Sequence, residues 1–474
     1  MTDTEARIGR ADPGLVDEAA LVQFVARQRW FGGKSRDVVG ASILDATLLR
    51  SSSPYLVLAL VEVRFQPGTH DLYQLLFGFR PDEDGWKNNV IARADGWTVY
   101  GGLADPTLSR ELLHFMRGGR TFQSEEAAVD FRSVGALEGQ TVTPLDVWPL
   151  ESEQSNTSVV FDDELILKCY RRLEAGINPE LELLRFLTAR GFEGTPRLEG
   201  WYSYSGRLID TTLGIAQAYV PAVDGGWEFA RAALRGEAED DFLATVRRLG
   251  EVTGEMHVTL ASDPTDPAFA PEEPSVEALG ILTATMDEEI ERVFLDLPDT
   301  DVLAPIAGRG EEVREQLRQL SQFGAVGRVI RHHGDYHLGQ VLWTGSDWVV
   351  LDFEGEPARS LAERRRKRSP LRDVAGMLRS FAYAASAATI TDGIEAPEGW
   401  EQRARDEFLS GYLPAVEAQG LLPPSQEATE RLLAIYELEK AVYELRYELD
   451  NRPDWVEIPV AGIVRLLGIS AEAA

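Results

Sequence analysis

Cysteine is nearly absent from this chain of 474 residues, which contains only Cys169. A single thiol cannot form an intramolecular disulfide, so we expect no disulfide framework and a reducing, cytoplasmic environment. The first residues contain neither a basic region nor an apolar run, so no secretory signal is predicted. No run of about eighteen apolar residues occurs, so no transmembrane helix is expected either.

Basic residues are also scarce, with 47 Lys and Arg against 78 Asp and Glu, and the formal net charge is -31. Nucleic acids and anionic membranes both need a basic protein face, so neither is expected as a partner. The negative charge fits a solvated surface that favours solubility, and it could also attract a cationic substrate.

Histidine is rare too, yet three of the six histidines lie in one segment, Arg331–Gln340. The apolar run Trp348–Leu351 is typical of a short buried strand, which would place Asp352 at its end. Phosphoryl transfer from Mg-ATP needs a carboxylate beside the attacking hydroxyl and oxygen ligands for the metal. We therefore assign Asp335 as the catalytic base, and Gln340 and Asp352 as ligands of Mg²⁺.

A zinc site is the alternative for this segment, because His333 and His337 are four residues apart. The Gly334-Asp335 pair between them argues against a continuous helix, and the sequence offers no well-spaced third His or Cys ligand. The metal–phosphate interpretation is therefore favoured.

Three regions with different patterns divide the chain. Short β runs separated by turn residues dominate residues 1–135. Residues 136–222 form a second β-rich region, in which Pro149 marks an edge strand or a strand end. Residues 223–474 are mainly helical, except near the histidine-rich segment. A small β unit, a hinge and a helical unit with an Asp pair predict an α+β, bilobal protein-kinase-like fold.

Lys168 lies in an otherwise apolar strand, where a charged side chain needs a partner. Kinase-like folds use such a lysine to hold phosphates and a helix glutamate to hold the lysine. A helix is predicted after Asn178 as the cap and Pro179 as its first residue. Glu182 on this helix is the first choice for the partner and Glu180 the second. A lysine that simply reaches solvent near the strand end is the alternative.

No glycine-rich loop precedes Lys168, and the polar segment Gln154–Ser158 occupies its place. Its hydroxyls and backbone N–H groups could bind phosphates, although polar hairpin tips are common without such a role. The strand through Gln217 leads to the hinge, where an adenine would lie. The candidates for nucleotide binding are Lys168, Glu182, Ser155, Asn156, Thr157, Ser158, Gln217, Tyr219 and Val220.

A basic run, Arg364–Arg368, stands out in this acidic chain. It is interpreted either as a solvated loop paired with nearby carboxylates or as a source of one or two arginines that neutralise phosphate charge.

Together these segments resemble the bacterial maltokinases, relatives of the aminoglycoside phosphotransferases within the protein-kinase-like superfamily. The resemblance covers nearly the whole chain and rests on Gln28–Arg36, Gln154–Ser158, Lys168, Ile177–Pro179, His333–Leu342, Val350–Glu363, Ser369–Ala385, Lys440–Glu444 and Asn451–Trp455. It implies an extra N-terminal, mostly β cap subdomain at residues 1–135, a small N-lobe at 136–222 and a C-lobe with the catalytic and metal site at 223–474.

The resemblance further implies ATP- and Mg²⁺-dependent phosphorylation of maltose at its anomeric hydroxyl, which gives maltose 1-phosphate for α-glucan and glycogen synthesis. Trehalose synthase is the candidate protein partner. Two positions differ from protein kinases: Gln340 stands where they carry Asn, and Glu354 stands where their D-F-G motif has Gly.

The residues that bind the sugar are less defined. A disaccharide needs polar groups for its hydroxyls and aromatic faces for its rings. The candidates are His337, Tyr443, Glu444, Arg452 and Trp455. A helix packing stripe with a structural tryptophan explains the last four equally well.

Two other functions compete with maltose phosphorylation. The first is a kinase of another sugar or amino sugar, such as glucosamine or an aminoglycoside, which an acidic pocket would favour. The second is a non-catalytic nucleotide-binding partner of trehalose synthase. The presence of Lys168, Asp335, Gln340 and Asp352 together disfavours that second function.

Overall fold

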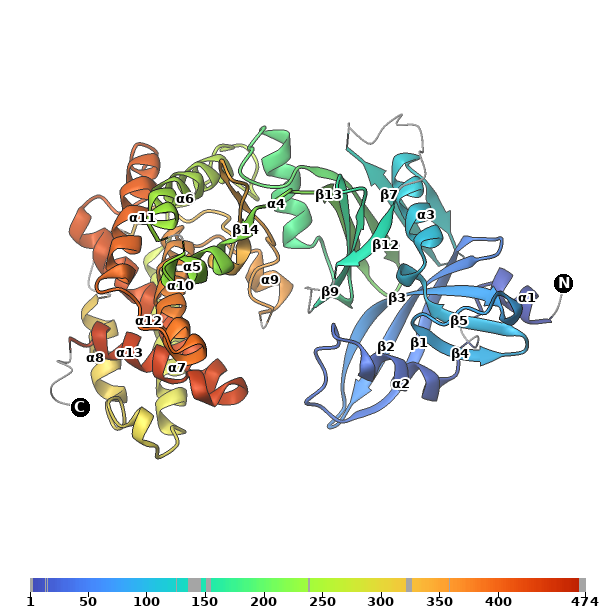
Figure 1. Cartoon of the computed structure of the whole chain (residues 1–474), viewed down its shortest axis with the longest axis horizontal. Helices are drawn as coiled ribbons and strands as arrows, with labels where there is room; N and C mark the ends of the chain where they lie inside the picture. The colour runs from blue at the N-terminus through green and yellow to red at the C-terminus, as the bar shows by residue number, and fades with distance from the viewer. Residues whose placement is uncertain are drawn as a thin grey trace. The chain divides into compact units, whose positions relative to one another are not determined.

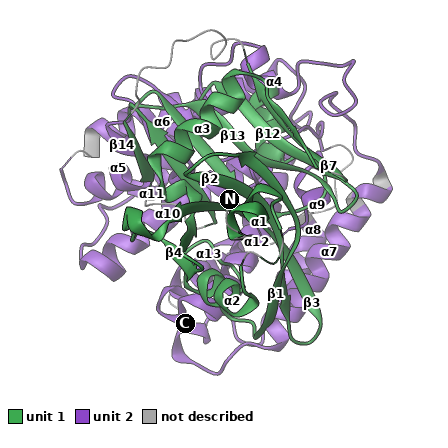
Figure 2. Cartoon of the chain, turned by 90° about the vertical axis from the view of Figure 1, so that its right-hand side faces the viewer, with its two compact units in different colours: residues 1–185, 196–221 green, residues 186–195, 222–474 purple. Residues whose placement is uncertain are grey.

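The computed structural model describes residues 3–12, 14, 16–124, 126–134, 146–150, 155–237, 239–320, 326–357 and 359–468. The chain forms two compact units, unit 1 with residues 1–185 and 196–221, and unit 2 with residues 186–195 and 222–474 (Figure 2). Unit 1 is rich in strands and unit 2 in helices (Figure 1), so the predicted α+β fold class is confirmed.

The chain passes from unit 1 to unit 2 between residues 221 and 222. The C-lobe was predicted to start at residue 223, one residue later. The predicted boundary at 135/136 falls among residues outside the described ranges, and unit 1 includes the residues on both sides of it. The boundaries of the three predicted domains therefore stay predictions.

The first sheet of unit 1 is antiparallel and has the strand order β1-β2-β3-β5-β4, with β11 paired to β3. Its strands are β1 (Val38–Arg50), β2 (Tyr55–Phe65), β3 (Thr69–Pro81), β4 (Val90–Ala94), β5 (Trp97–Gly101) and β11 (Arg172–Leu173). The accompanying helices are α1 (Asp3–Gly9), α2 (Glu18–Arg27), η2 (Asp82–Asp84) and η3 (Gly102–Ala104).

The continuous apolar run in β2 is buried on both faces of this sheet. Leu56, Leu58 and Leu60 belong to one hydrophobic cluster, whereas Val57 and Val61 belong to another that includes residues of α2. Successive side chains of a strand point to opposite faces, so this run supplies two cores at once.

The second sheet of unit 1 has the order β6-β7-β12-β13-β10-β9-β8. Its strands are β6 (Thr121–Gln123), β7 (Ala127–Ser133), β8 (Val147–Leu150), β9 (Asn156–Phe161), β10 (Leu165–Tyr170), β12 (Leu198–Gly206) and β13 (Asp210–Ala218), and α3 (Pro106–Arg117) packs against β7. β8, which contains Pro149, is the edge strand that the proline predicted. β6 and β7 come from the region predicted as a separate cap, yet they extend the sheet of the N-lobe.

Unit 2 is mainly helical and contains a small three-stranded sheet, β14-β15-β16. Its strands are β14 (Asp224–Gly225), β15 (Val341–Trp343) and β16 (Trp348–Val350). Its helices are α5 (Gly226–Leu234), α6 (Glu239–Leu260), α7 (Val276–Leu295), η5 (Asp301–Leu303), α8 (Gly310–Leu320), η6 (Leu338–Gln340), α9 (Leu361–Arg364), α10 (Leu371–Asp392), α11 (Trp400–Glu417), α12 (Gln426–Asn451), η7 (Pro453–Trp455) and α13 (Glu457–Leu466).

Helices α6 and α11 approach each other through two glycines. A Cβ added to Gly250 would lie 2.0 Å from the carbonyl oxygen of Phe408, and one added to Gly411 would lie 2.0 Å from that of Arg247. Because neither position has room for a side chain, the two backbones pack directly. Within the described ranges, none of the helices combines the length and the apolar character that crossing a membrane requires.

Candidate active site

The catalytic segment of unit 2 is fixed by one carboxylate from helix α10. Asp373 accepts hydrogen bonds from the backbone N–H groups of His333 at 2.7 Å and Gly334 at 2.9 Å. Its Oδ2 atom also lies 3.0 Å from Nε2 of His257. Asp373 is only 2% exposed, and charged hydrogen bonds in such surroundings are strong. It therefore fixes the loop immediately before Asp335.

Two further residues of α10 complete this support. Gly376 lets the loop approach closely, because a Cβ there would lie 2.4 Å from the carbonyl oxygen of Tyr336. The hydroxyl of Ser380 accepts a hydrogen bond from the N–H of Leu338 at 3.2 Å. Asp373, Gly376 and Ser380 lie on one helix face through their i, i+3, i+7 spacing. This stripe was not predicted from the sequence, although the i, i+3, i+7 spacing is a signal that the sequence contains.

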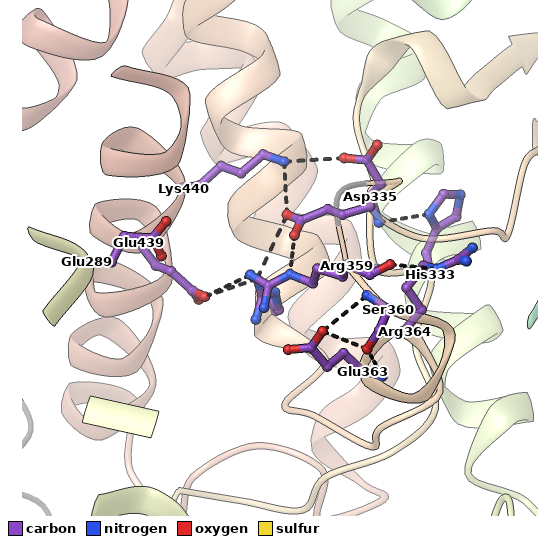
Figure 3. Close-up of polar contacts among 12 residues, drawn as sticks. Glu289, His333, Asp335, Arg359, Ser360, Glu363, Arg364, Glu439 and Lys440 are labelled. Atoms are coloured by element: carbon purple, nitrogen blue, oxygen red, sulfur yellow. Dashed lines mark hydrogen bonds and ion pairs between the residues drawn. The ribbon is translucent and has the colours of Figure 1, made fainter. Parts of the chain in front are cut away.

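His333 connects the catalytic segment with the strand end that carries Asp352. Its Nε2 atom is 2.7 Å from the carbonyl oxygen of Leu351, and its Nδ1 atom accepts from the N–H of Asp335 at 3.3 Å (Figure 3). The carbonyl can only accept, so the proton lies on Nε2. With both ring nitrogens engaged in this way, His333 does not fit the zinc alternative.

The two predicted metal ligands lie side by side in unit 2. The side-chain amide of Gln340 donates to Oδ2 of Asp352 at 3.2 Å, and the N–H of Leu351 donates to the carbonyl of Gln340 at 2.8 Å. Asp352 has a φ of 59°, a left-handed conformation that is uncommon for a residue other than glycine and is often found at functional sites. Carboxylate and amide oxygens are the ligands that Mg²⁺ prefers, so these residues fit the ion.

His337 has a structural contact in this segment. Its Nδ1 atom accepts from the N–H of Gly339 at 3.0 Å and so caps helix η6. Burial lowers the pKa of this histidine, which agrees with an accepting ring nitrogen. A contact of His337 with a sugar stays a prediction.

Asp335 faces a pocket that is rich in charged side chains. Besides Asp335, the charged and aromatic residues of the lining are four acidic residues, three cations and three tyrosines: Glu289, Glu356, Asp373, Glu439, Arg359, Arg372, Lys440, Tyr336, Tyr436 and Tyr443.

Lys440 of helix α12 joins the carboxylate of Asp335 to a second carboxylate. Its Nζ atom lies 3.2 Å from Oδ1 of Asp335 (Figure 3) and 3.5 Å from Oε1 of Glu356. Burial would lower the pKa of Lys440, but the charges of Asp335 and Glu356 outweigh it and raise the pKa. Burial would raise the pKa of Glu356, but Lys440, Arg372 and Arg359 outweigh it and lower the pKa to about 2. Lys440 and Glu356 are therefore both charged near neutral pH.

The other carboxylates of the pocket also have cationic partners. Arg359 is ion-paired with Glu356 and lies 3.5 Å from Glu439. Arg372 lies 3.0 Å from Glu439 and 3.8 Å from Glu356. Glu289 lies 3.7 Å from Arg292 and 3.8 Å from Arg446. Asp335, Glu356, Glu439 and Glu289 are thus each paired with a lysine or an arginine of the protein itself.

The predicted sugar residues near the C-terminus separate into two groups. Tyr443 lines the pocket with Asp335. Glu444 instead accepts two hydrogen bonds, at 3.0 and 2.7 Å, from the fully buried Arg379 of α10, so it holds two helices together. Arg452 donates to Glu448 at 2.7 Å and lies 4.9 Å from the ring of Trp455. These contacts favour the packing alternative for Glu444 and Trp455, and sugar binding by Glu444, Arg452 and Trp455 stays a prediction.

The nucleotide-binding candidates of unit 1 centre on Lys168 in β10. Its Nζ atom lies 2.9 Å from Oε2 of Glu180, which also accepts from the hydroxyl of Tyr170 at 2.9 Å. Lys168 is 5% and Glu180 1% exposed, so the lysine does not simply reach solvent. Such a buried pair is costly to desolvate and indicates a functional role.

Glu180, our second choice, is thus an ion-pair partner of Lys168, and a role of Glu182 beside the lysine stays a prediction. Helix α4 (Pro179–Ala189) begins as predicted, with the Asn178 side chain accepting from the N–H of Glu180 at 2.8 Å. Residues two apart on a helix lie on nearly opposite faces. Both glutamates are nevertheless buried, Glu180 at 1% and Glu182 at 5% exposure.

The polar segment before Lys168 is more regular than a loop. Asn156–Ser158 lie in β9, and Ser158 is the register partner of Lys168. The hydroxyl of Thr157 accepts from Nε of Arg171 at 2.8 Å. Ser155 precedes the strand, and residues 151–154, with Gln154, lie outside the described residues. Phosphate binding by this segment stays a prediction.

The predicted hinge residues follow β13. Gln217 is paired with Ile166 on one side and Leu198 on the other, so it belongs to the sheet. The N–H of Tyr219 donates to the carbonyl of Glu164 at 2.8 Å and extends the sheet by one bond. This amide is therefore engaged in the fold, and adenine binding at Gln217, Tyr219 and Val220 stays a prediction.

The basic run includes two side chains that bind loop carbonyls. Lys367 donates to the carbonyls of Pro267 and Ala270, each at 2.7 Å. Arg364 donates to the carbonyl of Glu354 at 3.1 Å. These contacts favour the structural interpretation of the run over phosphate binding.

Comparisons with known proteins agree with this arrangement. The family model "Maltokinase N-terminal cap domain" matches residues 24–105, and the model "Phosphotransferase enzyme family" matches residues 146–409. The resemblance found in the sequence is thereby confirmed at the level of these families.

Two individual relatives are named glucosamine kinases and not maltokinases. The chain is 28% identical over 333 residues to a glucosamine kinase of Mycolicibacterium smegmatis, across 67% of this chain and 79% of that protein. It is 29% identical over 454 residues to a glucosamine kinase of Streptacidiphilus jiangxiensis, across 89% of this chain and 97% of that protein.

A solved structure of a glucosamine kinase with glucosamine, ADP and inorganic phosphate superimposes with a TM-score of 0.66, at 19% identity, across 94% of this chain and 98% of that one. A second crystal form of a glucosamine kinase gives a TM-score of 0.69 at 19% identity, across 98% of this chain and 100% of that one. At this identity the likeness shows the fold.

Proposed function

Because this chain belongs to the phosphotransferase enzyme family, we propose that it transfers the γ-phosphoryl group of ATP to a sugar, with maltose as the acceptor. The anomeric hydroxyl of maltose attacks the γ-phosphorus, the bond from that phosphorus to the β,γ-bridging oxygen breaks, and maltose 1-phosphate and ADP leave. The hydroxyl proton passes to an oxygen of Asp335.

Asp335 suits the role of base because it is fixed from two directions. The loop before it is held by Asp373, and one of its carboxylate oxygens is held by Lys440 at 3.2 Å. Phosphoryl transfer depends mainly on positioning and electrostatics, so a rigidly held base is what the reaction needs.

Other residues are proposed to bind the nucleotide and its metal. Gln340 and Asp352 offer oxygens to Mg²⁺, which when bound neutralises charge on the phosphates. Lys168, held by Glu180, offers its ammonium group to the phosphates.

The pairing of charges in the pocket is the observation that favours a neutral sugar as the acceptor. Glu289, Glu356, Glu439 and Asp335 all have a cation of the protein as partner, so the pocket is acidic in composition but compensated in charge. A polyol can hydrogen-bond to such paired groups, whereas an ammonium group finds no uncompensated carboxylate among them. The match to the maltokinase cap model supports maltose within this class.

Phosphorylation of glucosamine is the second candidate. It is favoured by the names of the relatives described above and by the fold of the complex with glucosamine. It requires that an ammonium group displace one of the internal cations from its carboxylate.

The test is a coupled assay of ADP release with Mg-ATP and maltose, glucose, glucosamine, trehalose and kanamycin in parallel. We expect turnover with maltose, and ³¹P NMR of the product should show phosphate on the anomeric carbon. Turnover with glucosamine alone would replace the proposal by the second candidate. Silence with all five sugars would leave a non-catalytic role beside trehalose synthase, which co-elution of the two purified proteins would test.

The two glutamates at the start of helix α4 provide a matched pair of variants. Glu180→Gln should raise the KM for Mg-ATP by roughly tenfold, because Lys168 loses the charge that holds it. Glu182→Gln, two residues away on the same helix, should change this KM far less. Steady-state kinetics at saturating sugar measures both, and an equal effect of the two substitutions would contradict the assignment of Glu180.

A further inference from the structure

Lys440 has the most unusual position of the charged residues in the pocket. Its ammonium group lies between two carboxylates, Asp335 and Glu356, and over the ring of Tyr443, with Nζ 5.1 Å from the ring centre. A cation between two carboxylates and an aromatic face is the arrangement that would receive the ammonium group of an amino sugar. Here the protein supplies that cation itself.

A sugar that reacts in this pocket must come close to Lys440. Its attacking hydroxyl has to lie about 2.8 Å from Asp335 to transfer its proton, and Asp335 is 3.2 Å from Nζ. An ammonium group on the same sugar ring then lies within about 10 Å of Nζ. At an effective dielectric constant of about 20, this repulsion corresponds to a factor of roughly ten or more in affinity.

Removing the charge of Lys440 would reverse the preference. Glu356 would keep its partners Arg359 and Arg372, but Asp335 would lose the cation that it contacts. The uncompensated carboxylate would then attract a cationic sugar, while a neutral sugar would gain nothing from it.

We infer that Lys440 is a specificity-determining residue that excludes amino sugars by occupying their cation site beside Asp335. This inference rests on the proposed function, since it assumes that a sugar binds in the Asp335 pocket. It adds the chemical reason for the choice of acceptor and the residue responsible for it.

The test compares glucosamine with glucose, which have the same ring and differ in the group on carbon 2. Their Kd values are measured by titration calorimetry on the full chain with Mg-ADP, at a pH below the pKa of the glucosamine amine. The proteins are the wild type, Lys440→Met, which keeps the length of the side chain without its charge, and Lys440→Arg, which keeps the charge. The ratio of the two Kd values cancels any general effect of the substitution on sugar binding.

We expect the wild type and Lys440→Arg to bind glucose more tightly than glucosamine. Lys440→Met should shift the ratio toward glucosamine by roughly tenfold or more. An unchanged ratio in Lys440→Met, with measurable binding of glucose, would overturn the role of Lys440 while leaving the proposed function intact. A wild type that prefers glucosamine would overturn the inference as well. Failure of the wild type to bind or phosphorylate maltose would count against the proposed function instead.

Discussion

Asp335→Asn should reduce kcat for maltose phosphorylation by roughly 10²- to 10⁴-fold and leave the Kd for Mg-ATP nearly unchanged. Asparagine has the size of aspartate and can still accept a hydrogen bond from Lys440, so the pocket should keep its shape. It cannot take a proton from the sugar hydroxyl. The loss should therefore appear in the chemical step and not in nucleotide binding.

Single-turnover kinetics with radiolabelled ATP would measure this chemical step directly. Asp347→Asn is the matched control, because Asp347 lies in the same unit, in the turn before β16, where it is half exposed and paired with Arg248. The control should retain its activity. A normal single-turnover rate in Asp335→Asn would remove Asp335 from the mechanism.

Asp373→Ala should destabilise unit 2 by about 3–5 kcal/mol, the cost of removing one partner from a buried charged network. The backbone N–H groups of His333 and Gly334 would lose their acceptor, and so would the ring of His257. The catalytic loop should then open, and activity should fall even under conditions in which the protein stays folded. Urea unfolding measures the stability, and hydrogen exchange of residues 330–338 measures the loop.

Asp392→Ala provides the control on the same helix. Asp392 lies at the other end of α10 and forms an ion pair with Arg231 near the surface, where such pairs contribute little. Its removal should leave the urea midpoint and the exchange of residues 330–338 unchanged. If the loop exchanged equally fast in both variants, Asp373 would not be its anchor.

Residue types and local patterns predicted those features that depend only on neighbouring residues in the sequence. The proline in β8 indicated an edge strand, and Asn178 with Pro179 indicated the start of α4, because each acts on the backbone beside it. Asp335, Gln340 and Asp352 could be predicted as site residues because few residue types can perform phosphoryl transfer and these three lie close together in the sequence.

Contacts between distant segments were not predictable in the same way. The choice between Glu180 and Glu182 depends on how α4 is rotated about its axis, which packing decides. Asp373 lies 40 residues from His333 in the sequence, and Lys440 lies 105 residues from Asp335. Nothing in the local pattern of α10 or α12 shows which residue of another segment they face. For the same reason the pairing of the pocket carboxylates with Lys440, Arg359 and Arg372 could not be predicted from the sequence.

The sheet that joins β7 to β12 has a consequence for any shortened form of this protein. Seven residue pairs connect the two strands, from Ala127 with Gly206 to Ser133 with Gly200. A chain that began at residue 136 would leave β12 with a row of unsatisfied N–H and C=O groups, and exposed strand edges of this kind promote aggregation. The N-terminal region is therefore part of the scaffold on which Lys168 is mounted and not a removable module.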